Sequence, residues 1–176
     1  MTELSEAQPG RALAHGLERF NHLQKDEASI ALYSAFALHA WAAEVAAGRP
    51  YADLNALFAA AERAWEELDA AGWLEAFKAH PRIGERGGHS PAASEQEQIR
   101  VAQATTETLA ALADENRLYE ERFGFVFLIA AAGKTADEIL AELRRRMDSD
   151  RETELAQAAE EHRKITRMRL QTMVES

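Results

Sequence analysis

The spacing of hydrophobic and polar positions predicts helices along most of the chain. Leu13, Leu17 and Phe20 share one side of a helix expected over residues 11–22. A second helix is expected from Glu27 to about Trp41 or beyond. Gly48-Arg49-Pro50 should end it firmly, because proline cannot continue a helix and biases the preceding residue away from one.

The clearest helical stripe follows Asp53, whose carboxylate can cap the free amides of the next turn. We expect Gly72 to end this helix and a short one to follow around residues 73–79. The apolar stripe on the helix that follows Asp53 consists of Leu54, Leu57, Phe58, Ala61, Trp65 and Leu68.

Three further helices are expected in the second half of the chain. A long one should begin near Ala92 or Ser94 and reach about Arg117, and the capping box of Thr135 and Glu138 opens another to about residue 147. Asp150 can cap a last helix to about residue 174. Between the first two lies the aromatic run 119–129, which could be a buried strand or a buried helix.

Composition agrees with an all-α fold. Ala, Leu, Glu, Arg and Gln dominate, while β-branched residues are scarce and never alternate with a period of two. With 176 residues and no second domain or linker in view, residues 10–176 should form one compact multi-helix domain, after a disordered N-terminus at 1–9.

Charge and cysteine content exclude several classes of protein. The chain has no cysteine, which removes disulfide scaffolds, thiolate metal sites and thiol nucleophiles. Its net charge of -10 argues against nucleic acid as the main partner, because that binding neutralises phosphates with Lys and Arg. Small molecules or proteins are the expected partners. No secretory signal and no membrane-length apolar run is visible, so we expect a cytoplasmic protein.

Familiar cofactor motifs are absent. Gly133-Lys134-Thr135 is similar to the last three residues of a phosphate-binding loop, but that motif needs a glycine at the position of Leu128. The capping box explains these residues instead. No dinucleotide fingerprint and no Gly-x-Ser-x-Gly elbow occurs. The histidines at 15, 22, 39 and 162 lack the paired spacing of metal ligands, which predicts surface or partly buried structural roles for them.

The one long irregular segment runs over residues 80–91 and contains three glycines and two prolines. His80 opens it, and an imidazole suits proton transfer at neutral pH. A polar cluster at residues 94–98 follows. From spacing alone, a helix-terminal histidine is the favoured explanation of the first feature, and an ordinary N-cap explains the second without any function.

These motifs together resemble the 2-oxo-4-hydroxy-4-carboxy-5-ureidoimidazoline (OHCU) decarboxylases of urate breakdown. The resemblance covers about residues 17–174. It is carried by His80-Pro81-Arg82-Ile83-Gly84-Glu85, Ser94-x-x-Glu97-Gln98, Tyr119-x-x-Arg122-Phe123-Gly124-Phe125-x-Phe127, the turn Gly48-Arg49-Pro50-Tyr51 and the final Arg169-Leu170.

The resemblance implies an all-helical, homodimeric enzyme without metal or organic cofactor that converts OHCU to (S)-allantoin and CO2. His80 and Glu97 match the family's catalytic residues. Substrate-binding roles are implied for Pro81, Ser94, Gln98 and Arg169, and for the segment of Phe125, Phe127 and Ile129, which would lend backbone groups.

Two choices stay open at this point. The chain offers two Glu-Gln pairs, 95–96 and 97–98, and the family's serine three residues before the glutamate selects the second. The competing classes are a non-enzymatic helical module, with Phe123, Phe125 and Phe127 on a partner surface, and a related enzyme acting on another ureido acid. Convergence of His80, Glu97 and Arg169 on one pocket would favour an enzyme.

Overall fold

The computed structural model describes residues 9–84 and 91–175 and confirms the all-helical fold, since none of these residues forms a strand. Residues 1–8 lie outside the described part, as do residues 85–90 of the irregular segment. The helices are α1 (Pro9–His22), α2 (Lys25–Ala35), α3 (His39–Ala47), α4 (Leu54–Glu66), α5 (Ala70–Phe77), α6 (Pro91–Glu97), the 3-10 helix η1 (Val101–Gln103), α7 (Thr106–Phe123), α8 (Ala136–Arg146) and α9 (Arg151–Glu175).

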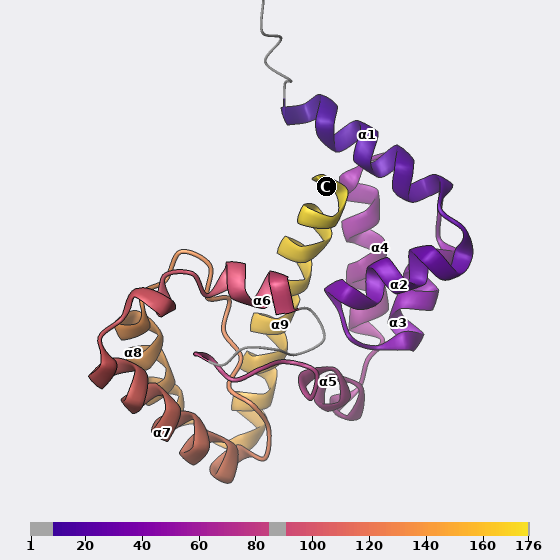
Figure 1. Ribbon diagram of the computed structural model, residues 1–176. Helices are drawn as coiled ribbons and strands as arrows, with labels where there is room; N and C mark the ends of the chain where they lie inside the picture. Colours follow the sequence, from indigo (N-terminus) through magenta and orange to yellow (C-terminus); the bar gives the residue numbers. More distant parts are fainter. Residues whose placement is uncertain (1–8, 85–90, 176) are drawn as a thin grey trace, which may run out of the picture. The chain divides into compact units, whose positions relative to one another are not determined.

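The chain divides into two compact units, residues 1–67 with 167–176 and residues 68–166. In the first unit α3 packs against both α2 and α4 (Figure 1). Trp41 is 1% exposed, and its indole N–H donates to the carbonyl of Ala61 at 3.1 Å, which ties α3 to α4. A Cβ on Gly16 would lie 1.5 Å from the carbonyl oxygen of Val174, so α1 and the end of α9 approach too closely for any larger residue.

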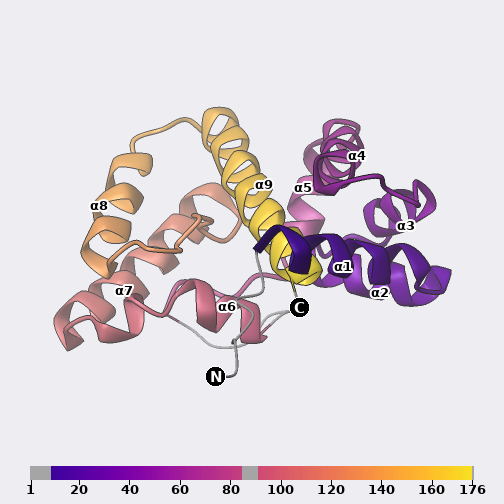
Figure 2. The same ribbon diagram turned by 90° about the horizontal axis from the view of Figure 1, so that it is seen from above.

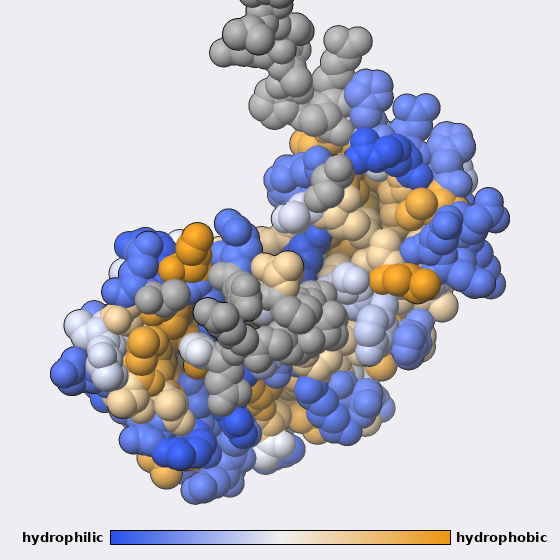
Figure 3. Space-filling model, in the orientation of Figure 1, coloured by the Kyte–Doolittle hydropathy of each residue, from blue (hydrophilic) through white to orange (hydrophobic). Residues whose placement is uncertain are grey.

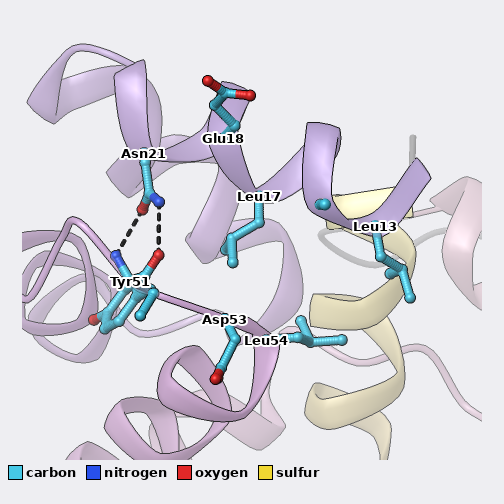
Figure 4. A pocket seen from close by; sticks show the side chains of 9 residues that line it. Leu13, Leu17, Glu18, Asn21, Tyr51, Asp53 and Leu54 are labelled. Atoms are coloured by element: carbon cyan, nitrogen blue, oxygen red, sulfur yellow. Dashed lines mark hydrogen bonds between the residues drawn. The ribbon is translucent and has the colours of Figure 1, made fainter. Parts of the chain in front are cut away.

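The turn after α3 is fixed by side chains from α1 and from the turn itself. The amide of Asn21 donates to the carbonyl of Tyr51 at 2.8 Å and accepts from its N–H at 2.9 Å (Figure 4). The guanidinium of Arg49 donates to the carbonyls of Phe20 and Leu23 at 2.9 and 2.8 Å. The predicted stop at Gly48-Arg49-Pro50 is where α3 ends, and these bonds join the turn that follows to the end of α1.

The second unit contains α5 to α8 and most of α9, with α7 and α8 side by side (Figures 1 and 2). A buried ion pair lies at its centre. Arg146 and Glu154 are 1% and 0% exposed, and Arg146 Nε donates to Glu154 Oε1 at 2.7 Å. The hydroxyl of Tyr119 donates to the same carboxylate. Burial, and then that hydrogen bond, raise the pKa of Tyr119 far above its ordinary value, so the phenol stays a neutral donor.

Residues 124–134 link α7 to α8 and belong to neither a helix nor a strand, so both alternatives for the end of the aromatic run are wrong. Tyr119 to Phe123 complete α7, and Gly124, at φ 81°, then turns the chain. Side chains anchor the backbone that follows. Arg146 donates to the carbonyl of Leu128 at 2.8 Å, and Glu161 accepts from the N–H of Ala130 at 2.8 Å.

Three predicted helix boundaries are wrong. The second helix is two helices, because Phe36 and Leu38 are extended and Phe36 packs, fully buried, 4.9 Å from the ring of Trp41. Gly72 does not end α4. It lies inside α5, where its N–H donates to the capping carboxylate of Asp69 at 2.9 Å. The long helix predicted from residue 92 is broken between α6 and α7, where Thr105 caps α7.

Predictions based on local capping are confirmed. Asp53 accepts from the N–H of Ala56 at 2.8 Å, and Thr135 and Glu138 form the complete capping box of α8. The N–H of Thr153 donates to Asp150 at 2.9 Å at the start of α9.

On the face drawn in Figure 3, hydrophilic residues surround smaller groups of hydrophobic ones. None of the helices in the described ranges combines the length and apolar character that a membrane crossing requires.

Candidate active site

His80 lies directly after α5, where the chain leaves the helix. Its N–H donates to the carbonyl of Phe77 at 3.0 Å, and Pro81 then prevents the helix from continuing. The imidazole is half-buried at the wall of a groove of about 730 Å³. The groove is lined by Ala71, Leu74, Glu75, Phe77, Lys78, His80, Pro81, Arg82, Glu120, Gly124, Phe125 and Val126. Three of the predicted site residues, His80, Pro81 and Phe125, therefore meet in one hollow.

His80 is bonded to a second histidine that sequence analysis assigned to a surface or partly buried role. His162 on α9 is 0% exposed, and its Nε2 lies 2.8 Å from Nε2 of His80. The two rings are perpendicular, with centroids 4.6 Å apart, and Phe77 packs edge-on against His162 at 5.4 Å. The sequence prediction for His162 is therefore wrong.

Arg82, two residues after His80, is committed to an ion pair. Its Nε and Nη2 donate to the two oxygens of Glu120 on α7 at 2.5 and 3.0 Å. This two-bond arrangement fixes the segment after His80 against α7. It also places a carboxylate against the guanidinium, so that Arg82 adds little net positive charge to the groove.

The second predicted cluster lies on and just after α6. Ser94 is 3% exposed, and its carbonyl accepts from the N–H of Gln98 at 3.1 Å. Glu97 and Gln98 are half-buried, whereas Gln96 is exposed. The side-chain oxygen of Gln98 accepts from the N–H of Gly84 at 2.7 Å. The cluster is thus joined directly to the segment that His80 opens.

Most side chains of the segment 125–129 are buried. Phe125, Phe127 and Ile129 are 7%, 0% and 4% exposed, with the two phenylalanine rings packed around Tyr119. Within the described residues, no backbone–backbone hydrogen bond joins residues 125–129 to another residue. Since Phe123 is also buried, these rings do not form the exposed partner surface on which the interaction-module alternative depends.

Arg169 lies on the part of α9 that belongs to the first unit and is 6% exposed. A second hollow, of about 320 Å³, lies in this unit between α1 and the start of α4 (Figure 4). Leu13, Leu17 and Leu54 line it, and the Asn21 amide and Asp53 carboxylate there hold backbone groups. Of its polar side chains, Asn21 and Asp53 thus serve the backbone, and Glu18 is the other carboxylate in the lining.

The remaining described histidines and acidic residues do not form a metal centre. His22 and His39 are exposed, the first bonded to the carbonyl of Glu18 and the second stacked on Tyr33 at 4.3 Å. In the described ranges, no three His, Cys, Asp or Glu side chains are grouped so that they could hold a metal ion.

Comparison with known proteins identifies the family. A sequence model of the OHCU decarboxylase family matches residues 21–171, nearly the whole chain. The chain belongs to the OHCU decarboxylase family.

Similar proteins include the 2-oxo-4-hydroxy-4-carboxy-5-ureidoimidazoline decarboxylase of Haloferax volcanii, which is 34% identical over 88% of this chain and 93% of its own length. The uric acid degradation bifunctional protein TTL of Arabidopsis thaliana is 34% identical over 74% of this chain, which spans only 42% of that protein. A crystal structure of OHCU decarboxylase in the presence of (S)-allantoin superposes with a TM-score of 0.73 at 30% identity, covering 82% of this chain and 96% of that one.

Within this OHCU decarboxylase chain, one signal in the sequence could have indicated His162. On α9 it falls in helical register with the buried residues Ala158, Ala159 and Ile165. A histidine on an otherwise apolar stripe is buried, and a buried imidazole needs a polar partner. The helical spacing could not predict which residue is the partner, because His80 lies 82 positions away in the sequence.

Proposed function

We propose that this protein is a carboxy-lyase that converts OHCU to (S)-allantoin and CO2 in urate breakdown. The observation that carries the proposal is the position of His80 at the wall of a groove in a chain of the OHCU decarboxylase family. Relatives named for this decarboxylation and a solved neighbour described with (S)-allantoin support it.

The reaction needs charge stabilisation and proton transfer. OHCU carries a carboxylate and a hydroxyl on one ring carbon. When the bond to the carboxylate breaks, CO2 leaves and the electron pair moves into the adjacent ring C=N group. The electrons of that C=N bond pass to its nitrogen, which takes up one proton from solvent. The hydroxyl then loses its proton as a carbonyl forms, and the neighbouring carbon gains one, so that one proton is consumed for each CO2 released. Groups that hold these protons in place on one face of the ring produce a single enantiomer.

His80 and Glu97 are the proton-handling residues in this proposal. An imidazole and a carboxylate can each take and return a proton near neutral pH when they are correctly placed. His80 acts near the reacting carbon, and Glu97 holds the hydroxyl or a ring nitrogen of the substrate. The half-buried setting of both side chains supports these roles, because it limits competition from water.

Hydrogen-bond donors complete the proposed site. Gln98 uses its side-chain oxygen for Gly84, and its NH2 can donate to the oxygens on which negative charge grows. The backbone N–H groups of the segment 125–129 can donate in the same way, while Ser94 and Arg169 bind polar groups of the substrate. Pro81 shapes the wall beside His80. Of the two Glu-Gln pairs, the bond from Gln98 to Gly84 supports the second.

The proposal is tested by following CO2 release from freshly generated OHCU with His80→Asn and Glu97→Gln. General acid–base groups contribute about 10²–10⁴-fold, so each variant should lose activity in that range while its circular dichroism and melting temperature stay close to wild type. His22→Asn removes an exposed imidazole and is the matched control, which should keep full activity.

Two outcomes would contradict the assignment. Folded His80→Asn and Glu97→Gln proteins that retain activity within a few-fold of wild type would remove both residues from the chemistry. A wild-type protein that leaves OHCU untouched but releases CO2 from another ureido acid would support the related-enzyme alternative.

We further propose that the protein is a cytoplasmic homodimer. Family resemblance supports the dimer, and the acidic, mostly polar composition supports a cytoplasmic location. Analytical ultracentrifugation should give twice the chain mass of 19.5 kDa, and fractionation of cells that contain the protein should recover it with cytoplasmic markers. A single species at the chain mass would contradict the dimer.

A further inference from the structure

We infer that His162 is the positioning residue of His80, holding the imidazole through the Nε2–Nε2 hydrogen bond so that one ring nitrogen of His80 is committed to α9. The inference rests on the proposed function in one respect, that His80 takes part in proton transfer. The bond itself can be tested without any substrate.

The geometry favours a fixed orientation. The two Nε2 atoms are 2.8 Å apart, which is a full hydrogen bond, and the rings meet at 89°. His162 is 0% exposed and packs edge-on against Phe77, the last residue of α5. Since Phe77 also accepts the backbone bond of His80, α5 and His162 together define where the catalytic ring lies.

The bond restricts the protons of the pair. For the two Nε2 atoms to be hydrogen-bonded, one must carry a proton and the other must not. Two neutral rings meet this condition, and so do two rings that share one additional proton. Two fully protonated rings do not, because both Nε2 atoms would then be donors, with like charges in contact. While this hydrogen bond exists, His80 and His162 therefore cannot both be imidazolium ions.

Charged groups on the surrounding elements already have partners of their own. Lys78, directly after α5, bonds to Glu75 at 2.6 Å, and Arg82 is paired with Glu120 of α7. On α9, Glu161 accepts from Ala130 and from Lys164. The bond between the two imidazoles is thus separate from these ion pairs.

The arrangement has a direct consequence for the reaction. A proton transfer through Nε2 of His80 requires the bond to His162 to break first, whereas a transfer through Nδ1 leaves it intact. Loss of His162 should therefore release the ring and lower the rate of the chemical step, while substrate binding through the other donors continues.

The test compares His162→Leu with His162→Gln. Leucine fills the buried site without a hydrogen bond, while the glutamine amide can again bond to His80. A catalytic ring released by even 1 Å can cost about 10²-fold, so His162→Leu should lower kcat by about 10–100-fold with KM nearly unchanged. His162→Gln should recover most of the lost kcat. His39→Leu, which removes an exposed imidazole, is the control and should match wild type.

A second readout needs no substrate. In protein labelled with ¹⁵N at histidine, the imidazole signals assigned to His80 should move in His162→Leu, and those of His162 should move in His80→Asn, while His39→Leu leaves both in place. Reciprocal shifts would support the hydrogen bond even if OHCU proved not to be the substrate, which separates this inference from the proposed function.

Three results would overturn the inference. His162→Leu could keep wild-type kcat, or the His80 signals could stay unchanged in that variant. His162→Gln could be as slow as His162→Leu although both are folded, which would mean that ring packing, not the hydrogen bond, is what His162 supplies.

Discussion

Gln98 illustrates how much a single side chain contributes to this site. Its oxygen accepts from the N–H of Gly84 at 2.7 Å, and Gly84 has φ 87°, a backbone conformation that glycine adopts without strain. The bond orients the amide, because an oxygen engaged by a donor leaves the NH2 as the outward group. Gln98 thus anchors the segment after His80, and the proposed function gives it a second role, donation to the substrate.

Substitution can separate these roles. Gln98→Glu keeps the acceptor for Gly84 but loses the donor and adds a charge that repels an anionic substrate. One lost hydrogen bond corresponds to about 10-fold, so kcat/KM should fall by at least that much while the melting temperature stays near wild type. Gln98→Leu loses both roles and should also destabilise the fold by about 1 kcal/mol in urea unfolding. Wild-type kcat/KM in Gln98→Glu would contradict the donor role.

At the scale of the element, α9 is the helix on which the site depends. Three residues of its buried side bind other elements. Glu154 accepts from Arg146, Glu161 accepts from the N–H of Ala130, and His162 is hydrogen-bonded to His80. Arg146 in turn holds the carbonyl of Leu128 and lies 4.6 Å from the ring of Phe127. The irregular segment 124–134 therefore keeps its conformation through side chains of α8 and α9, which take the place of a neighbouring strand.

Removing Arg146 from its buried ion pair with Glu154 tests how much this pair stabilises the fold. Arg146→Met leaves Glu154 buried without its cation, which typically costs about 3–5 kcal/mol of unfolding free energy. Arg145→Met is the control, because Arg145 forms an exposed pair with Glu142 that should contribute only about 0.3–0.5 kcal/mol. Urea unfolding of both variants measures the difference. Arg146→Met within 1 kcal/mol of wild type would contradict a structural role for the pair.

The helices predicted correctly from the sequence are those with local signals. Asp53 makes its capping bond to a residue three positions away, and so do Thr135 and Glu138. The neighbouring residues in the sequence therefore determine where these helices begin. The breaks at Phe36 and before Thr105 were missed because no proline or glycine marks them. There the burial of Phe36 against Trp41 outweighs local helix preference.

The same distinction explains which parts of the site could be predicted. His80 was found because it opens an irregular, glycine-rich segment and belongs to a motif, and both are local features. His162 was missed because its role is a contact between residues 82 positions apart. The pairing of Arg82 with Glu120 was invisible for the same reason, since an arginine near a proposed anion site is easily taken for a free charge.

At the scale of the whole molecule, the net charge of -10 opposes the approach of an anionic substrate. Cations at the site must offset this field locally, and Arg82 contributes little because Glu120 neutralises it. Within the second unit, the donors that the proposal assigns to the substrate are therefore uncharged, namely the NH2 of Gln98 and the backbone N–H groups of residues 125–129. Hydrogen-bond donors aimed at developing charge are effective in a site that excludes water.

The central claim is that this fold turns OHCU into one enantiomer of allantoin with His80 in the chemistry. The most direct measurement follows the circular dichroism of allantoin as it forms from freshly generated OHCU, with wild type, with His80→Asn and without protein. Wild type alone should form the (S) enantiomer rapidly, and His80→Asn should follow a slow course close to that of the protein-free solution. Equal rates in all three, or allantoin of mixed handedness with wild type, would contradict it.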